Sequence, residues 1–453
     1  MEFRNCIDLL RGASELVDVT VPVSPQLEMA AIIKRVVAQS NSCPALVFHS
    51  ISSSSFSCVA NLFGTADRLS MILSSSDGIN IAQRMSQLDD SVRSFDSFMR
   101  WLSTQDHFKP RRVCPPEMTL HEDFSAFAEI KVWPHDAGHY LSLAVVISQT
   151  RTGQQVNCGI YRVQIHGPHQ ATIHFRSGSD GHKIFSEYQK HNESMPVTII
   201  LGCDPALMFA AVFPLSKQIN EFTFASYIRQ KPVSYYCSEL SSLPIPMHSE
   251  IVIQGSLDPF KTLAEGPFGN HEGYYGDSVQ CPVFTLKRIE SRQDAVMPVT
   301  MIGTPPTENM VLGSYIAQLI IPLVKRQIPQ VLDVYMPSET IFHGCAFVQL
   351  YVDEQLERVK EQVLSHPLFA RSKLLVFVDD QVDIDQPQQL MWRVMNHYLH
   401  SDKKLNQGIP EQVVIDTVSC LKQRLLPNVE IENMVSDRWH ELGLESLTRN
   451  KGS

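Results

Sequence analysis

The stretch VNCGIYRVQIHGPHQATIHFRSGSDGH, residues 156–182, decides the fold class of this 453-residue chain. Within it, the runs IYRVQIHG and ATIHF are rich in β-branched and aromatic residues and are separated by a Gly-Pro turn signal, which is typical of paired strands. Similar runs lie on both sides: AEIKVWP, LSLAVVISQ, SEIVIQG and CPVFTLKRI. Many short strands with few helices, from about residue 117 to 303, predict a barrel or a sandwich.

The same stretch carries the densest set of polar side chains in the chain. Strand alternation places Asn157 and Tyr161 on one face and Cys158, Ile160 and Arg162 on the other. Successive strands could therefore present an amide, guanidinium groups and imidazoles to a phosphate or a metal. The histidines have no i, i+4 or HxH ligand spacing, however, so from spacing alone a solvated strand pair with incidental histidines is the simpler interpretation.

Outward from this stretch the pattern changes twice. Before it, helical periodicity predicts helices at 27–37 and 79–101 around a strand PALVFHSI, and the basic, proline-bounded segment KPRRVCPP (109–116) is the best linker. After it, strands and helices alternate, which is typical of an α/β layer. We therefore predict an α/β (α+β) chain with an N-terminal α/β domain (1–112), a central β domain (113–308) and a C-terminal α/β domain (309–453).

Composition narrows the class of protein. The chain has 38 Lys plus Arg against 48 Asp plus Glu, a net charge of −10, which argues against a broad nucleic-acid surface. The N-terminus has no signal-peptide pattern, and no apolar run is long enough to span a membrane. Ten scattered cysteines without CxxC pairs favour a reducing, cytoplasmic setting. The low charged fraction of 19% fits either buried interfaces or a Ser- and Gln-rich surface.

Two further segments could carry chemistry. In LAEGPFGNHEGYYGD (263–277), glycines allow tight turns, and a carboxylate beside aromatic residues could be desolvated, which would raise its pKa toward use as an acid or base. An ordinary surface loop is the alternative. In FPLSKQINEFTFASYIRQ, Glu221 stands at a helix start, where a plain capping role is the simpler interpretation. The chain has no GxSxG elbow and no P-loop.

Read in order, these segments resemble the UbiD-type decarboxylase family, whose members use prenylated FMN. The resemblance covers nearly the whole chain. The matching motifs are NCGIYR (157–162), GCDPA (202–206), EFTFAS (221–226), EGPFGN (265–270) with GYY (273–275), and GTPP (303–306) followed by VLG.

The resemblance implies a flavin-binding split β-barrel in the centre and a C-terminal α/β domain that mediates oligomerisation and closes over the site. It implies Mn²⁺ beside the cofactor phosphate, with K⁺ nearby. Asn157 and Glu221 match the family's metal ligands, and His182 is the candidate third ligand. The stretches that match the family's cofactor-binding residues are Ile160, Tyr161 and Arg162, followed by His174, Phe175 and Arg176.

The activity implied is reversible, non-oxidative decarboxylation of a (hetero)aromatic acid through a covalent adduct with the cofactor. Arg162 would orient the substrate carboxylate, and Glu265 matches an acidic partner of that arginine. The implied partners are the small acid, CO₂ and a prenylated-FMN synthase as cofactor supplier, with assembly as a homodimer or homohexamer and no nucleic acid or membrane.

The sequence departs from the family at position 270, where the usual proton donor is replaced by Asn270, and an amide cannot act as a general acid. Three explanations compete: Glu265 or a water held by Asn270 donates the proton, the substrate is an electron-rich ring such as pyrrole-2- or indole-3-carboxylate whose N–H or carboxylate binds Asn270, or the protein is a degenerate homologue. We favour the second. The alternatives are a 4-hydroxy-3-polyprenylbenzoate-type decarboxylase of quinone biosynthesis and a non-catalytic flavin-binding scaffold.

Overall fold

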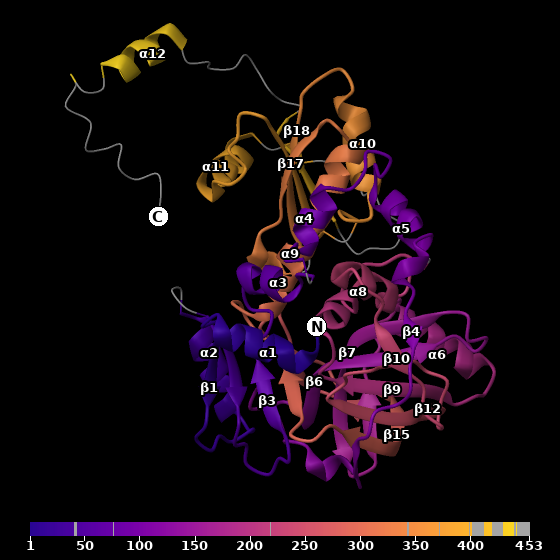
Figure 1. Ribbon diagram of the computed structural model, residues 1–453. Coiled ribbons are helices and arrows are strands. Elements are labelled where there is room, and N and C mark those ends of the chain that lie inside the picture. The colour runs from indigo at the N-terminus through magenta and orange to yellow at the C-terminus, as the bar shows by residue number, and fades with distance from the viewer. Residues whose placement is uncertain are drawn as a thin grey trace.

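The chain is organised in three parts (Figure 1). The computed structural model describes residues 1–39, 43–75, 77–217, 219–341, 344–370, 372–397, 399–400, 412–418, 429–438 and 441. An N-terminal sheet lies beside a β-barrel, and a third layer of strands and helices stands above both. This mixed α/β architecture confirms the predicted fold class. The predicted boundaries at residues 112 and 308 stay predictions.

The N-terminal part is a four-stranded sheet in the order β1-β2-β3-β16. Helix α1 (Phe3–Gly12) packs on one face of the sheet and α2 (Glu28–Val37) on the other. The last strand comes from beyond the barrel, so the sheet is complete only when the central region has folded. The strand bounds are β1 (Leu16–Val19), β2 (Ala45–Phe48), β3 (Ser57–Ala60) and β16 (Val296–Val299).

The central part is a closed barrel rather than a sandwich. Its strands follow the order β12-β9-β6-β7-β8-β15, and pairing between β12 and β15 closes the ring. A short strand, β5 (Thr119–His121), adds to the outside of β15. The barrel strands are β6 (His139–Gln149), β7 (Val156–Gly167), β8 (Gln170–Ile173), β9 (Met195–Leu201), β12 (Ile251–Glu265) and β15 (Val279–Ser291).

Strand alternation decides what each barrel face does. On β7, Tyr161 and Val163 pack into an apolar cluster to which every barrel strand contributes, whereas Cys158 and Ile160 pack against the helices outside. The predicted division of β7 into two faces is therefore confirmed. The helices beside the barrel are α6 (Asp180–Lys190), α7 (Pro205–Ala210) and α8 (Glu221–Arg229).

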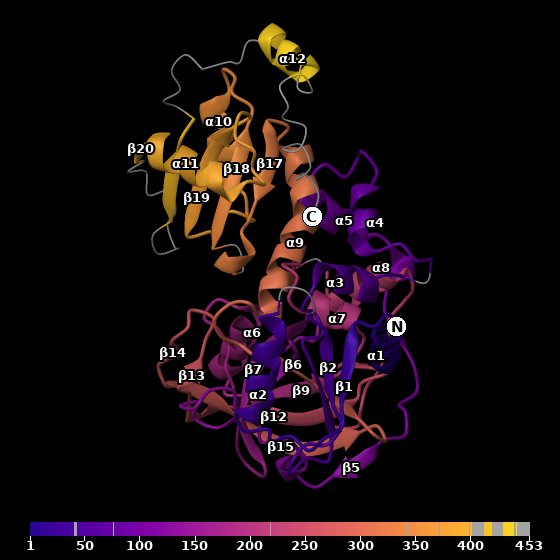
Figure 2. The same ribbon diagram turned by 90° about the vertical axis from the view of Figure 1, so that its left-hand side faces the viewer.

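The C-terminal part begins with the long helix α9 (Glu308–Gln327), which runs from the body of the molecule to the upper layer (Figure 2). Its sheet has the order β17-β18-β19-β21-β20, with α10 (Leu356–Ser365) on one face and α11 (Pro387–His397) on the other. The remaining elements are β17 (Val331–Tyr335), η3 (Ser338–Thr340), β18 (Cys345–Leu350), β19 (Leu374–Asp379), β20 (Leu399–His400), β21 (Val413–Asp416) and α12 (Val429–Asp437).

Three local predictions were wrong. The helix predicted at 79–101 is two helices, α4 (Ile81–Ser86) and α5 (Phe95–Ser103), because Ser94 begins a new capping box. The run AEIKVWP is not a strand but follows η2 (Phe124–Ala126) as irregular chain. The linker 109–116 contains β4 (Arg111–Arg112), which joins β10 (Ser234–Tyr236) and β11 (Ile245–Pro246) in a small sheet. Helices α3 (Ala66–Ile72) and η1 (Asp106–Phe108) complete the N-terminal region.

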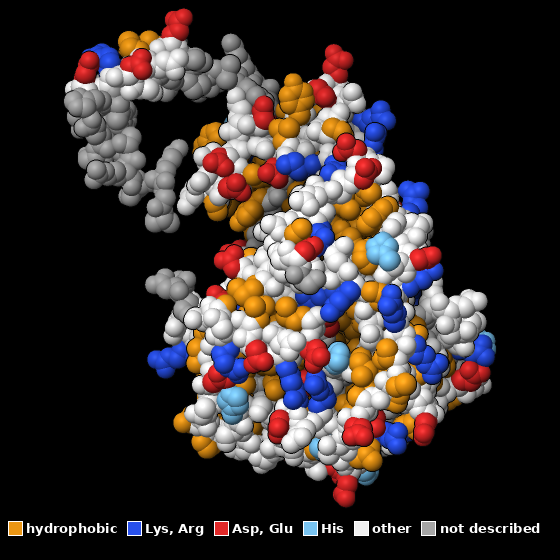
Figure 3. Space-filling view, viewed as in Figure 1, with side chains coloured by type: hydrophobic (Ala, Val, Ile, Leu, Met, Phe, Trp, Pro, Cys, Tyr) orange, Lys and Arg blue, Asp and Glu red, His pale blue; other side chains and the backbone are white. Residues whose placement is uncertain are grey.

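Charged side chains of both signs are mixed on the molecular surface, as expected for a chain without a broad basic surface. On the face shown in Figure 3, Lys and Arg side chains are interspersed with Asp and Glu. No helix among the described residues is long and apolar enough to cross a bilayer.

Candidate active site

Three polar side chains meet where strands β7, β8 and β12 come together. Arg162 lies on β7, His174 directly follows β8, and Glu265 ends β12. The Nη2 atom of Arg162 donates to Glu265 Oε2 over 2.6 Å, and His174 Nδ1 lies 3.0 Å from the same oxygen. His174 Nδ1 also lies 3.2 Å from Arg162 Nη2. Three residues that are distant in the sequence thus form one hydrogen-bonded cluster, which we call the Arg–His–Glu cluster.

Glu265 is fully buried, with 0% of its surface exposed. Burial alone would raise the pKa of this carboxyl, but hydrogen bonds from His174 and Arg162 outweigh it and lower the pKa from its usual value. The prediction that a desolvated carboxylate in this segment has a raised pKa is therefore wrong for Glu265. Among the described residues no group donates to Glu265 Oε1, so a buried acceptor is left open.

Residues that the motifs did not identify complete the surroundings of the Arg–His–Glu cluster. Gln164 Oε1 accepts from Tyr140 Oη at 3.1 Å and from the Gly266 N–H at 3.0 Å, which fixes the start of the glycine-rich loop on the barrel. Burial and the nearby Glu265 raise the pKa of Tyr140. The Sγ atom of Cys281 lies 3.6 Å from His174 Nδ1. Only Gln164 had a signal in the sequence, since alternation places it on the face of Arg162.

The loop after Glu265 folds as a small hairpin. Its strands are β13 (Phe268–Gly269) and β14 (Tyr275–Gly276), and the Phe268 ring lies 4.7 Å from the guanidinium carbon of Arg162. At the tip, the Asn270 side-chain oxygen accepts the Glu272 N–H at 2.9 Å. Asn270 therefore stabilises its own turn, and among the described residues no hydrogen bond or ion pair joins its side chain to the Arg–His–Glu cluster.

A tryptophan explains two of the motif glycines. The Trp133 indole N–H donates to the Ile302 carbonyl at 2.7 Å, and the ring lies against the backbone of both Gly269 and Gly303. A Cβ at either glycine would approach a Trp133 atom to 2.2 or 2.4 Å, which is closer than packing permits. The glycines of EGPFGN and GTPP thus have a packing role beside the site.

The second predicted group forms around the N-terminal end of β7. Asn220 caps α8, which leaves the neighbouring Glu221 carboxylate free to accept the Cys158 N–H at 3.2 Å. Glu221 therefore lies against β7 next to Asn157, whose Nδ2 atom is buried without a partner among the described residues. Burial raises the pKa of Glu221 to about 8, and the nearby Asp180 raises it as well. The predicted simple capping role of Glu221 is wrong, because Asn220 performs it.

The start of α6 lies close to this group. The Gly181 N–H donates to Tyr161 Oη at 3.2 Å, and a Cβ at Gly181 would collide with Phe175 and Tyr161. His182 lies in the first turn of α6, where its backbone N–H bonds to the Ser179 hydroxyl. Within the described part of the chain, no hydrogen bond or ion pair joins the His182 side chain to Asn157 or Glu221.

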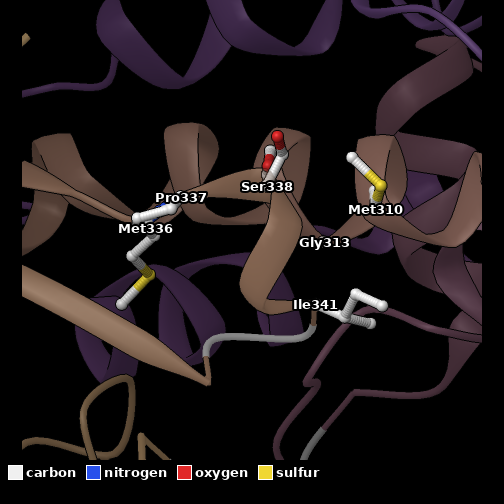
Figure 4. A pocket seen from close by; sticks show the side chains of 7 residues that line it. Met310, Gly313, Met336, Pro337, Ser338 and Ile341 are labelled. Carbon is white, nitrogen blue, oxygen red and sulfur yellow. The ribbon is translucent and has the colours of Figure 1, made fainter. Parts of the chain in front are cut away.

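The remaining cofactor candidates are less enclosed. Ile160 is partly buried against the helices outside the barrel, the Phe175 ring packs edge-on against Tyr161 at 4.9 Å between ring centroids, and Arg176 is exposed. A small hollow lies between the start of α9 and the turn after β17 (Figure 4). Met310, Gly313, Met336 and Ile341 line the hollow. The sequence offers Met301, Thr304, Ile341, Phe342 and His343 as candidate substrate-pocket residues. Ile341 lines this hollow, and Phe342 and His343 lie outside the described residues.

Comparison with known proteins identifies relatives for nearly the whole chain. Residues 111–305 match the family model of the 3-octaprenyl-4-hydroxybenzoate carboxy-lyase Rift-related domain. Residues 7–87 and 310–402 match the N-terminal and C-terminal domain models of the same carboxy-lyase. An uncharacterized protein of Chlamydia trachomatis is 31% identical over 404 residues, which are 86% of this chain and 68% of that protein. One of Archaeoglobus fulgidus is 28% identical over 406 residues, 88% and 84% of the two chains.

Solved structures share the fold. The closed form of vanillic acid decarboxylase from Sedimentibacter hydroxybenzoicus superposes with a TM-score of 0.78 at 22% identity, covering 99% of each chain. An evolved dimeric form of the UbiD-class enzyme HmfF from Pelotomaculum thermopropionicum, in complex with prFMN, gives 0.76 at 19% identity, covering 95% of this chain and 98% of that one.

Proposed function

Because the chain belongs to the UbiD family of carboxy-lyases, we propose that it catalyses the reversible, non-oxidative decarboxylation of a (hetero)aromatic carboxylic acid with prenylated FMN. The observation that carries this proposal is the Arg–His–Glu cluster. A buried, ionised Glu265 holds Arg162 in place through one oxygen and leaves its other oxygen open. Such an arrangement suits a site that binds a carboxylate and manages a proton.

The residues at the head of β7 fit a metal-bound cofactor phosphate. Glu221 has no Lys or Arg within ion-pair distance among the described residues, and Asp180 adds negative charge nearby. Asn157 lies beside it and would offer its amide oxygen as a second ligand, while its Nδ2 is buried without a partner among the described residues. Oxygen ligands of this kind suit Mn²⁺, with His182 as the proposed third ligand and K⁺ near the same phosphate.

The flavin itself would lie beside the matched residues, of which Ile160 and Arg162 are on one face of β7 and Tyr161 is on the other. Ile160, Tyr161 and Arg162 on β7, and His174, Phe175 and Arg176 after β8, are the proposed cofactor-binding residues. Gly181 supports this, because a side chain there would press on Phe175 and Tyr161. When bound, prenylated FMN supplies an electrophilic centre that would stabilise the electron pair that CO₂ leaves on the ring carbon.

Each residue of the site then has a separate task. Arg162 binds and orients the substrate carboxylate, since its Nε has no partner among the described residues and the Phe268 ring supports its guanidinium group. Glu265 keeps Arg162 in position and handles the proton that replaces CO₂. Burial of Glu265 excludes water, which strengthens the hydrogen bonds of its carboxylate with Arg162 and His174.

We further propose that the substrate is an electron-rich heteroaromatic acid, such as pyrrole-2- or indole-3-carboxylate. The support is Asn270, which places an amide where the family places an acid. Its oxygen accepts one N–H from Glu272 and retains a second lone pair. That oxygen could accept a ring N–H, and the amide NH₂ could donate to the carboxylate.

The test is to co-express the chain with a prenylated-FMN synthase and to measure the bound flavin, the bound metal and CO₂ release. The panel should contain pyrrole-2-, indole-3- and furan-2-carboxylate, benzoates, cinnamates and a prenylated 4-hydroxybenzoate. Bound flavin with release of CO₂ from N–H heteroaromatic acids is the expected result. Turnover of the prenylated hydroxybenzoate alone would refute the substrate class, and bound flavin without any turnover would refute the activity.

Assembly and location remain proposals as well. We propose a homodimer or homohexamer, because α11 leaves Met391, Trp392 and Met395 more than half exposed. Light scattering of the purified chain would measure the oligomer directly, and a monomer would refute it. The cytoplasmic location stays a prediction.

A further inference from the structure

The site contains an ionisable group for which the motifs give no chemical role beyond cofactor binding. This group is His174, whose Nδ1 lies 3.0 Å from Glu265 Oε2, 3.2 Å from Arg162 Nη2 and 3.6 Å from Cys281 Sγ. One nitrogen thus faces an acceptor and a permanent donor at once. Whether Nδ1 carries a proton therefore decides whether it bonds to Glu265 or to Arg162.

Decarboxylation at this site needs a proton source that the sequence does not supply at position 270. Loss of CO₂ leaves an electron pair on the ring carbon, and that carbon must take up a proton. Asn270 cannot donate one, and Arg162 does not release its protons at working pH. Glu265 is ionised at rest because its hydrogen bonds lower its pKa, so it has no proton of its own to give.

The other groups that face His174 are poor donors too. Cys281, on β15, keeps its proton because burial and the nearby Glu265 raise the pKa of its thiol to about 12. Burial and Glu265 also raise the pKa of Tyr140 on β6. Histidine is the side chain that ordinarily exchanges protons between about pH 5 and 8.

Building on the proposed decarboxylation, we propose that His174 supplies the proton that replaces CO₂ and delivers it through Glu265. The bond between the ring carbon and the carboxylate breaks, and its electron pair stays with the ring carbon. That carbon takes a proton from the Glu265 carboxyl group, which has received it from Nδ1 of the His174 imidazolium. Water then reprotonates the neutral imidazole, and no oxidant or reductant is needed.

A metal ion is the competing use of the same atoms. The donor atoms of His174, Glu265 and Cys281 all lie within 4.8 Å of one another, as in a metal site. However, Arg162 Nη2 already lies 2.6 Å from Glu265 and 3.2 Å from His174. Its positive charge takes the place that a cation would need, so a mobile proton fits this cluster better than a metal does.

The first test is chemical rescue of His174→Ala in the flavin-loaded protein. We expect the rate of decarboxylation per bound flavin to fall by about 100-fold or more, and imidazole in the buffer to restore part of it. Pyrazole, which has the same size but is not protonated at neutral pH, should not restore it. The control is His169→Ala, because His169 is exposed in the turn before β8. Equal rescue by both azoles would show that His174 only fills space.

The second variant, His174→Gln, keeps a hydrogen bond to Glu265 but cannot titrate. The wild-type rate should decline with rising pH, because the neutral imidazole has no proton to deliver, and this decline should be absent from the variant. An unchanged pH profile at an unchanged rate would overturn the relay. If the wild type itself binds flavin but releases no CO₂, the proposed function fails instead.

A third readout needs no turnover. In full-length chain labelled with ¹⁵N-histidine, the Nδ1 resonance of His174 is identified as the signal that is missing from His174→Gln. This resonance should move when Glu265→Gln is introduced, because the partner for its proton is weakened. An identical Nδ1 resonance in both proteins would contradict the shared proton, whatever the substrate is.

Discussion

Glu265→Gln is the substitution that most directly perturbs the site. It removes the negative charge that faces Arg162 and His174 while it keeps the size of the side chain. Breaking a buried ion pair by changing one partner costs about 3–5 kcal/mol. The Arg162 side chain keeps 22% exposure, so we expect the lower end, about 3 kcal/mol, which is a fall of about 6–12 °C in Tm for a domain of the size of the central part.

The pH dependence of the stability difference between wild type and Glu265→Gln gives a second check. Hydrogen bonds hold the folded-state pKa of Glu265 below its usual value of 4.5. The ionised carboxylate therefore contributes stability that is fully present above about pH 4.5 and is lost as pH falls through the folded-state pKa. The stability gap between wild type and Glu265→Gln should narrow on acidification.

The assay is thermal unfolding of cofactor-free protein from pH 8 down to about pH 3, a range that extends below the usual pKa of the carboxyl. The control is Glu239→Gln, which changes an exposed glutamate in the same part of the chain and should alter stability by less than about 0.5 kcal/mol. If Glu265→Gln were as stable as this control at pH 7, Glu265 would not be holding Arg162, and the account of the site would be refuted.

Three further results are expected. Because Glu221 has a pKa of about 8, Mn²⁺ must displace a proton, so the apparent affinity measured by calorimetry should fall up to tenfold per pH unit below 8; a flat profile would contradict this role. Asn270→Asp keeps the acceptor of its turn, so Tm should change by less than about 2 °C while activity shifts away from N–H heteroaromatic acids, and an unchanged preference would show that Asn270 does not select the ring. Gly269→Ala brings a methyl group against Trp133 and should cost about 1–3 kcal/mol in chemical denaturation; a neutral effect would show that Trp133 can move.

Much of the fold could be predicted from local signals. The helix predicted at 27–37 is observed as α2 (Glu28–Val37), and the predicted strand PALVFHSI contains β2 (Ala45–Phe48). Ser94 is a capping residue that indicates a new helix inside 79–101, but the apolar periodicity around it favoured the prediction of one continuous helix. The run AEIKVWP failed for another reason, since its apolar residues fill the core without a neighbouring strand edge.

The site divides in the same way. Arg162 and Gln164 could be placed on one face by alternation alone, and Glu265 stood in a dense motif. The contact between His174, Cys281 and Glu265 could not be predicted, because it exists only when pairing of β12 with β15 closes the barrel. Asn270 is the reverse case. The sequence predicted a role in substrate binding for it, and the structure also shows a hydrogen bond that stabilises its own turn.

The measurement that tests the central claim most directly is turnover in D₂O, followed by ¹H NMR. Flavin-loaded protein should convert pyrrole-2- or indole-3-carboxylate to the ring compound, with CO₂ released and one deuterium at the carbon that carried the carboxylate. Arg162→Ala, with flavin still bound, should do neither. Wild-type protein that holds prenylated flavin and metal but leaves every aromatic acid of the panel intact, without deuterium incorporation, would contradict the account.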